Sequence, residues 1–230
     1  VGGGTVSRPG ALLFDFDGLI LDTETCTYET VVEIFAEHGA TLDVGWWHSI
    51  LGNGGHAHWT EVLGEQLGRP LDRPVLVARA ERRRLAVMHT LPVCAGVADL
   101  LDAAAVEGVP AAVASSSSAD WVEGHLARLG LRDRFDAVIT RDDVGGDGAR
   151  TKPEPDLFLV AAEALAVEPA RCVVLEDSPN GVAAGRAAGM AVVAVPGPMT
   201  ASLDLSAAHL VVPSLVEVDL RVLGSLLAAG

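Results

Sequence analysis

Two carboxylates directly follow an apolar run in the stretch Ala11-Leu12-Leu13-Phe14-Asp15-Phe16-Asp17-Gly18. A short, uninterrupted apolar run is typical of a strand that is buried on both faces of a parallel sheet. Asp15 and Asp17 lie two residues apart at its end and point to the same side, and Gly18 allows a sharp turn beside them. We therefore expect a first strand that brings two carboxylates to one place, where they are able to share a cation.

Apolar runs of strand length recur along the chain, at residues 110–114, 137–140, 172–175 and 191–195. Each is preceded or followed by an Ala- and Leu-rich segment of helical length. Strands that alternate with helices in this way predict an α/β fold, in which a doubly wound parallel sheet is covered by helices on both faces. The functional sites of such sheets lie beyond the carboxyl ends of the strands.

The alternation is interrupted between residues 23 and 90, where amphipathic helical patterns occur without a convincing strand. We predict that residues 23–90 form an inserted α-helical cap domain. Residues 11–22 and 91–230 are then the α/β core domain. Residues 1–10 are rich in glycine and lack periodicity, so we expect a flexible leader there.

The composition, with 50% hydrophobic and 20% charged residues, predicts a compact globular protein. Sixteen basic against 31 acidic residues give a formal net charge of −15, which argues against nucleic acid or anionic membranes as partners. No apolar run is long enough to span a bilayer and the first residues do not resemble a signal peptide, so we expect a soluble, cytoplasmic monomer or weak homodimer. Cys26, Cys94 and Cys172 lack metal-site spacing and are expected to be reduced thiols in packing roles.

A run of four serines, Ser115 to Ser118, follows the second predicted strand and precedes a helical segment. Hydroxyls and free backbone N–H groups at the start of a helix favour an anion, although ordinary helix capping explains the same pattern. Lys152, the only lysine of the chain, lies between Thr151 and Pro153 ahead of another helical segment. Its compact positive charge suits both carboxylates and phosphate.

A second pair of acids, Glu176 and Asp177, follows the apolar run at 172–175. Ser178 is placed to cap the next helix, with Pro179 in its first turn. Paired carboxylates at the end of a buried strand require a compensating charge, and a hard divalent cation such as Mg²⁺ suits oxygen ligands beside a phosphate. Four elements thus supply a nucleophile, anion donors, a cation and metal ligands at the ends of different strands.

In the order and content of these four motifs, the sequence resembles the haloacid dehalogenase superfamily, in the branch with a helical cap inserted after the first motif. The resemblance covers residues 11 to about 200. It implies that Asp15 is the nucleophile and Asp17 the general acid and base. Ser115, with Ser116 beside it, would bind the transferring phosphoryl group, and Lys152 would both bind phosphate and steady Asp15.

The resemblance also implies Mg²⁺ as the cofactor, held by Asp15, Glu176 and Asp177 together with Asp17, the last through its backbone carbonyl. The activity it predicts is hydrolysis of a small phosphorylated metabolite through an aspartyl phosphate. Dehalogenases of the superfamily need neither the metal nor an acid at the position of Asp17. Phosphonatases use a cap lysine, and residues 23–90 contain none.

Two alternatives to a phosphatase remain from the sequence. A β-phosphoglucomutase type of sugar phosphate mutase has a very similar pattern, but its histidine, arginine and lysine on the substrate side correspond to Thr27, about Gly55 and Ser118 here. A protein that binds a phosphorylated ligand on the same scaffold without turnover would usually lack a nucleophile or a metal ligand, and none is missing.

The cap segment contains other residues with two possible interpretations. His56 and His58 are expected in an exposed loop, or else in contact with a substrate or metal. Arg82, Arg83 and Arg84 are predicted to form a solvated helix face. Trp46, Trp47 and Trp59 are expected to pack inside the cap, with the substrate pocket as the alternative. No motif identifies the substrate, because specificity depends on such side chains.

Overall fold

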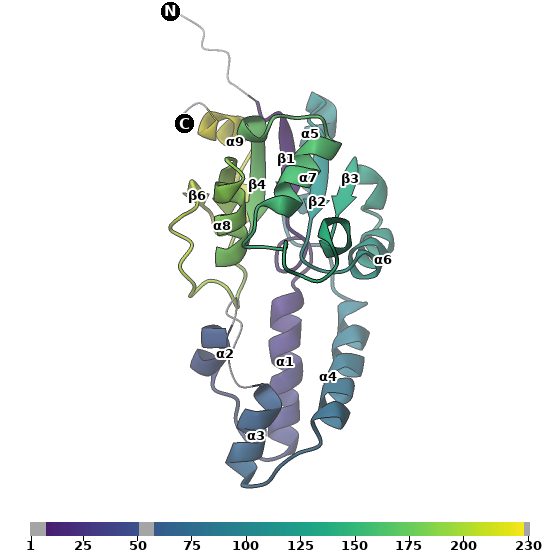
Figure 1. Cartoon of the computed structure of the whole chain (residues 1–230), viewed down its shortest axis with the longest axis vertical. Coiled ribbons are helices and arrows are strands. Elements are labelled where there is room, and N and C mark those ends of the chain that lie inside the picture. Colours follow the sequence, from purple (N-terminus) through teal and green to yellow (C-terminus); the bar gives the residue numbers. More distant parts are fainter. Residues whose placement is uncertain (1–7, 51–57, 228–230) are drawn as a thin grey trace, which may run out of the picture.

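The computed structural model describes residues 8–50 and 58–227. These residues form two parts, an α/β body and a helical projection below it (Figure 1). No helix within the described ranges is long and apolar enough to cross a membrane.

The described strands make one sheet in the order β3-β2-β1-β4-β5-β6, and every neighbouring pair is parallel. The strands are β1 (Ala11–Phe14), β2 (Ala111–Ala114), β3 (Ala137–Ile139), β4 (Cys172–Glu176), β5 (Ala191–Ala194) and β6 (Leu210–Val211). β1 lies in the middle, paired with β2 on one side and β4 on the other. The register sets Phe14 opposite Leu175, so the residues that follow these strands emerge side by side.

Helices cover both faces of the sheet, which confirms the predicted doubly wound α/β fold. Alternate residues of β1 enter different cores: Leu12 and Phe14 belong to one apolar cluster, and Ala11 and Leu13 to another. The first cluster includes residues of α5 (Val97–Glu107), α6 (Ala119–Leu129) and α9 (Leu220–Leu226), and the second includes residues of α7 (Asp156–Ala164) and α8 (Pro179–Ala187). Short 3₁₀ turns complete this part at Arg132–Arg134, Arg141–Val144, Pro169–Arg171 and Leu215–Glu217.

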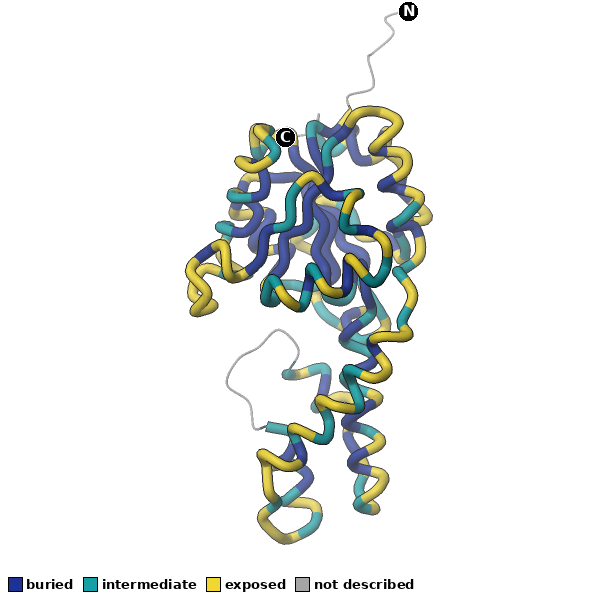
Figure 2. Tube along the Cα trace, turned by 90° about the vertical axis from the view of Figure 1, so that its right-hand side faces the viewer, coloured by how far each residue is buried: buried dark blue, intermediate teal, exposed yellow. Residues whose placement is uncertain are grey.

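Only helices occur between β1 and α5 in the residues that are described: α1 (Thr23–Glu37), α2 (Val44–Ile50), α3 (Trp59–Leu67) and α4 (Arg73–Met88). Aspartates cap the two long ones, because Asp22 accepts a hydrogen bond from Thr25 N at 3.1 Å and Asp72 accepts one from Val75 N at 3.2 Å. These helices share a third apolar cluster of their own. Figure 2 shows buried residues concentrated in the strands and along one side of the cap helices. We refer to residues 23–90 as the cap, although its boundaries remain a prediction.

Two details of the fold differ from the sequence pattern. β6 was not predicted, because two residues at the edge of a sheet carry too little periodicity to identify a strand. Of the predicted leader, residues 1–7 lie outside the described ranges. Pro9 is buried and the Gly10 N–H donates to the Arg171 carbonyl at 2.8 Å, so these two residues are attached to the body.

Candidate active site

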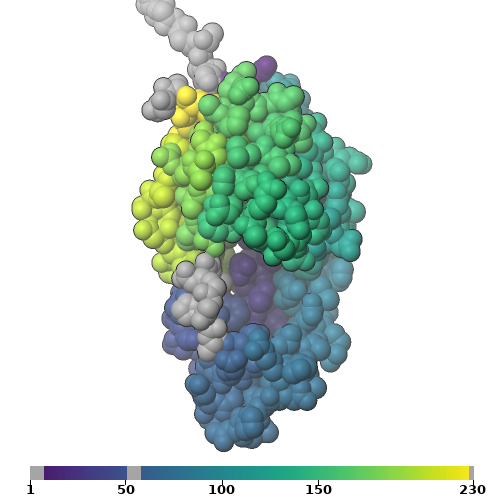
Figure 3. All heavy atoms as spheres, in the orientation of Figure 1, coloured from purple at the N-terminus to yellow at the C-terminus, as the bar shows by residue number. Residues whose placement is uncertain are grey.

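A cleft of about 710 Å³ lies at the carboxyl ends of the strands, between the sheet and the cap. It is visible as a hollow between the two parts in the space-filling view (Figure 3). Its volume lies within the range of about 300–1,000 Å³ that is usual for small-molecule sites. Every residue that the sequence assigned to catalysis, phosphate binding or metal binding lines it: Asp15, Asp17, Ser115, Ser116, Lys152, Glu176 and Asp177.

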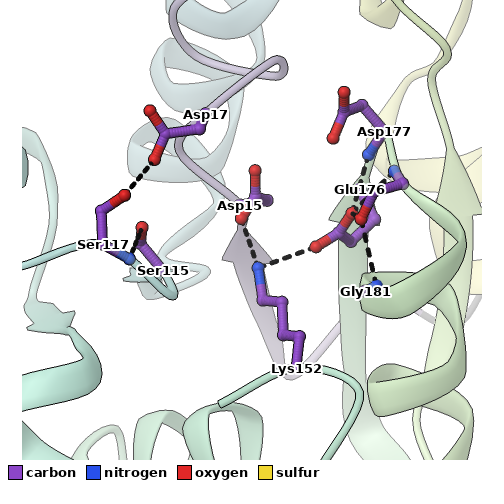
Figure 4. Close-up of polar contacts among 9 residues, drawn as sticks. Asp15, Asp17, Ser115, Ser117, Lys152, Glu176, Asp177 and Gly181 are labelled. Atoms are coloured by element: carbon purple, nitrogen blue, oxygen red, sulfur yellow. Dashed lines mark hydrogen bonds and ion pairs between the residues drawn. The ribbon is translucent and has the colours of Figure 1, made fainter. Parts of the chain in front are cut away.

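Asp15 continues β1 and is fixed by its neighbour strand, because its N–H donates to the Leu175 carbonyl at 2.9 Å. Asp15 is 6% exposed as a residue, and its carboxylate accepts a hydrogen bond from Lys152 Nζ. The same ammonium group donates to Glu176 Oε1 at 2.7 Å. Lys152 therefore bridges the carboxylates that follow β1 and end β4, as Figure 4 shows.

Glu176 is fully buried, and its second oxygen is held by the start of α8. Oε2 accepts hydrogen bonds from Asp177 N, Ser178 N and Ser178 Oγ, each at 2.9 Å. Ser178 also caps α8 by accepting from Gly181 N at 3.1 Å, as predicted, with Pro179 in the first turn. A Cβ atom on Gly181 would lie 1.7 Å from Glu176 Oε1, so only glycine leaves room for this carboxylate.

Asp177 lies beside the loop that follows β1. A Cβ atom on Gly18 would come within 2.1 Å of Asp177 Oδ2, and Gly18 has a φ of +91°, which is accessible mainly to glycine. The turn there is closed by a hydrogen bond from Gly18 N to the Leu21 carbonyl at 2.8 Å. Thr200 Oγ1 donates to Asp177 Oδ2 at 3.4 Å. Asp15, Glu176 and Asp177 thus form a buried group with ligand atoms within 4.8 Å of one another.

The charges of this group are unbalanced. Burial raises the pKa of Asp15 to about 8; the Lys152 ammonium lowers it, while Glu176 and Asp17 raise it further. Burial, together with Glu176 and Asp15, also raises the pKa of Asp177 well above its usual range. Burial lowers the pKa of Lys152, but the carboxylates of Asp15 and Glu176 outweigh this effect and hold it above its ordinary value. One ammonium group faces three carboxylates, and a hard divalent cation with oxygen ligands fits the remaining charge.

The Asp17 carboxylate lies apart from this group, on the other side of Asp15 (Figure 4). Its Oδ2 accepts a hydrogen bond from Ser117 Oγ at 2.6 Å, and its Oδ1 accepts one from the Trp121 indole N–H at 2.9 Å. Both donors come from the segment that follows β2. The side chain is therefore held at the open side of the cleft. The expectation that the carboxylates of Asp15 and Asp17 share one cation is not met, because hydrogen bonds hold the Asp17 carboxylate away from the acidic group. The metal contact through the Asp17 backbone carbonyl, which the family resemblance implies, stays a prediction.

The serine run lies between β2 and α6. Ser115 is buried, its N–H donates to the Ile139 carbonyl at 2.9 Å, and its Oγ accepts from Ser117 N at 3.0 Å. Ser116 is exposed at the edge of the cleft. Asp142, not a serine, caps the first turn of α6 by accepting from Ala119 N at 2.8 Å. No serine side chain of the run caps α6, and Ser115 lines the cleft.

A model of the haloacid dehalogenase-like hydrolases matches residues 9–189 of the chain. The chain belongs to this family. YhcW of Bacillus subtilis (strain 168) is 41% identical over 213 residues, which cover 93% of this chain and 95% of YhcW. Fructose-1-phosphate phosphatase YqaB of Escherichia coli (strain K12) is 35% identical, with 80% of this chain and 94% of YqaB covered.

Among solved structures, this hydrolase is similar to a HAD family hydrolase of Deinococcus radiodurans R1 with bound phosphate and sodium. The TM-score is 0.77 at 30% identity, and the superposition covers 92% of this chain and 93% of the other. The resemblance read from the four motifs is therefore confirmed, and the chain is an enzyme of a hydrolase family whose members here include a phosphatase.

The cap side of the cleft in this hydrolase is formed by α1 and α4, through residues that no motif marks: Thr23, Glu24, Thr27, Glu81 and Arg84. The prediction of a solvated face for Arg84 was wrong. Its guanidinium lies 5.0 Å from the centre of the Trp121 ring and 3.9 Å from Glu81. Arg83 instead pairs with Glu33 and Glu37 on α1, and Arg82 is exposed.

The other cap residues that were singled out lie away from the catalytic group. Trp47 is buried in the cap cluster, and Trp46 and Trp59 pack against it, as expected. His58 caps α3 by accepting from Thr60 N at 3.3 Å. His56 and Gly55 lie outside the described residues. The three cysteines are free thiols, two of them buried.

Trp121, Ser117 and Thr200 touch site carboxylates and were not assigned roles from the sequence. For Trp121 a signal exists, because an indole two residues into the helix that follows the serine run faces the same strand ends. For Thr200, no feature of the sequence indicates that its hydroxyl contacts Asp177.

Proposed function

We propose that this protein is a Mg²⁺-dependent phosphatase that hydrolyses a small phosphorylated metabolite through a phosphorylated Asp15. The observation that carries the proposal is the buried group of Asp15, Lys152, Glu176 and Asp177 at the floor of a cleft of small-molecule size. Family membership and the similarity to a fructose-1-phosphate phosphatase support the same reaction class.

In the first step, an Asp15 carboxylate oxygen forms a bond to phosphorus while the bond from phosphorus to the leaving oxygen breaks. Asp17 donates its proton to that leaving oxygen, so that the product departs as a neutral alcohol. Lys152, in contact with Asp15, offsets the repulsion between the anionic nucleophile and the anionic substrate. Ser115 at the end of β2 holds the transferring group through its hydroxyl.

In the second step, Asp17 takes a proton from water, whose oxygen forms a bond to phosphorus. The bond between phosphorus and Asp15 breaks, and inorganic phosphate leaves. Because Ser117 and Trp121, from the loop after β2 and the first turn of α6, hold its two oxygens, Asp17 is available on the open side of the cleft in both steps.

The donor set fits Mg²⁺. Asp15, Glu176 and Asp177 offer carboxylate oxygens that lie close together, and Gly18 and Gly181 permit that approach. Bound there, Mg²⁺ would add positive charge beside the phosphoryl oxygens.

Hydrolysis is favoured over isomerisation of a sugar phosphate by the side chains at the positions where a mutase binds its substrate. Thr27 stands where a mutase has histidine, and its hydroxyl donates to the Thr23 carbonyl at 2.8 Å within its own helix. Ser118 replaces a lysine. A second phosphate group would find neither a cation nor a titratable proton donor at these two positions. Their side chains therefore disfavour the binding of a sugar bisphosphate.

Two measurements test the proposal, with release of inorganic phosphate from a panel of phosphomonoesters as the readout. Chelation should abolish release and Mg²⁺ should restore it. Asp15→Asn should lower turnover by at least about 10³-fold, because an amide does not attack phosphorus. Circular dichroism of the variant controls for folding. A rate within tenfold of the wild type would contradict the role of Asp15, and full activity in excess chelator would contradict the metal.

A further inference from the structure

The catalytic cleft adjoins a smaller compartment on the cap, which is itself partly open to solvent. The compartment has a volume of about 240 Å³ and shares Thr27, Glu81 and Arg84 with the cleft. It lies between α1 and α4, with Trp59 of α3 contributing to its wall. Its volume is below that of usual ligand sites, and three of its lining residues also line the cleft, so it is best placed to receive one end of a ligand that is bound in the cleft.

The inner wall of the compartment is apolar. Val31, Trp59, Val77 and Ala80 contribute hydrocarbon and ring surface. Two threonines, which would make the wall polar, have their hydroxyls engaged within α1.

Thr27 Oγ1 donates to the Thr23 carbonyl at 2.8 Å, and Thr30 Oγ1 donates to the Cys26 carbonyl at 2.9 Å. With the hydroxyls turned to the helix backbone, a ligand in the compartment finds no free hydroxyl donor on these two residues. A polar group that entered would lose its hydrogen bonds to water and would gain none from these two hydroxyls. An apolar group avoids this desolvation cost.

Charge occurs only at the mouth, among the residues that line the compartment. Glu81 and Arg84 lie there, 3.9 Å apart, and the Arg84 guanidinium also stacks over Trp121. This pair offers an acceptor and several donors to a polar, uncharged segment such as a hydroxyl or ether. It does not offer an unopposed cation to a second phosphate.

We propose that the leaving group of the substrate passes this mouth and places an apolar end in the compartment. This inference rests on the proposed function, because it assumes that the phosphate lies at Asp15. The substrate class is then a phosphomonoester whose far end is a short alkyl chain or a single ring without charge.

The test compares ethyl phosphate with hexyl phosphate, which carry the same charge and leaving groups of similar basicity. Values of kcat/KM are measured by phosphate release in Mg²⁺. For the wild type we expect hexyl phosphate to be preferred by at least about tenfold, because binding in the compartment removes the added methylene groups from water.

Ala80→Leu fills the compartment with a good helix former and should bring the hexyl-to-ethyl ratio close to one. Ala78→Leu, exposed on the same helix, is the matched control and should keep the wild-type ratio. If Ala80→Leu does not fold by circular dichroism, Val77→Thr is used, since it adds a hydroxyl with little change in volume and should also lower the ratio.

A wild-type ratio near one would overturn the inference. So would a high ratio that persists in the folded compartment variant, because the hexyl group would then bind elsewhere. If none of ethyl phosphate, hexyl phosphate and 4-nitrophenyl phosphate were hydrolysed, the proposed function would be contradicted. The failure of this inference is therefore distinguishable from the failure of the proposed function.

Discussion

The two walls of the cleft are built in different ways. On the core wall, Asp15, Ser115 and Glu176 are buried, and the backbone of neighbouring strands or of α8 sets their positions. On the cap wall, Thr27 and Arg84 project from helices, and each keeps polar contacts within its own helix, Thr27 with Thr23 and Arg84 with Glu81 and Met88.

This difference separates two tasks. A carboxylate held by backbone N–H groups has one geometry for every substrate, so the core wall sets the chemistry. Side chains on helix surfaces can be replaced by others of different shape and polarity without disturbing the sheet, so we expect the cap wall to set which leaving groups fit. Changes in the core should therefore affect all esters alike, and changes nearer the cap should depend on the ester.

Among the changes that test this comparison without removing a catalytic group, the largest effect is expected from Gly181→Ala. The new methyl group would occupy the space of the Glu176 carboxylate, although alanine is otherwise favoured in a helix. We expect kcat/KM to fall by at least about 100-fold for every ester, because the contacts of Glu176 with Lys152 and the predicted metal are lost. Gly124→Ala, in α6 with open space around it, is the matched control and should be active and up to about 1 kcal/mol more stable. Equal activity of the two variants would show that the close fit around Glu176 is dispensable.

A smaller effect is expected at Trp121, which joins the two walls. Trp121→Phe removes the N–H that holds Asp17 and should lower kcat/KM about tenfold for alkyl phosphates, which need a proton on the leaving oxygen. The loss should be less for 4-nitrophenyl phosphate, because nitrophenolate leaves without protonation. Trp47→Phe is the control, since the indole N–H of Trp47 has no hydrogen-bond partner among the described residues. A loss of equal size for both esters would indicate a packing role only.

The smallest effect is expected in the pH dependence of the thermal stability, to which the buried carboxylates of the core wall contribute. Burial raises the pKa of Asp15 to about 8, so between about pH 4 and pH 8 the folded state binds more protons at this residue than the unfolded state. Stability of the chelated protein should therefore be highest below this window and should fall as pH rises through it. We expect the Tm to be lower at pH 8 than at pH 5.5 by at least about 4 °C, and Mg²⁺ to restore most of the difference. Asp15→Asn should make the profile less steep but not flat, because burial also raises the pKa of Asp177; an equally steep profile in that variant would assign the effect to other groups.

Much of the core wall was predictable because each part of it is encoded locally. Five strands appear as uninterrupted apolar runs, and apart from Lys152 the charged and hydroxyl residues of the site follow these runs within a few residues. The parallel order brings the ends of such strands together, so four separate motifs indicated one site. β6 escaped prediction, since a two-residue edge strand exists only through its pairing with β5.

The cap wall was less predictable. Arg82, Arg83 and Arg84 are chemically identical in the sequence, yet one is exposed, one pairs with α1 and one lines the cleft. Successive residues of a helix are rotated by about 100° around its axis. Only the packing of α4 against α1 decides which of the three arginines faces the cleft.

The sequence by itself determined the doubly wound sheet, the inserted helices, the family and the acidic group with its lysine, because strand burial and motif spacing are local properties of the chain. Only the tertiary structure decided that Trp121 holds Asp17, that Gly181 makes room for Glu176 and that an apolar compartment adjoins the cleft. Those features depend on contacts between segments about a hundred residues apart, on the path of the chain from β4 into α8, and on how whole helices pack, and neither periodicity nor spacing carries that information.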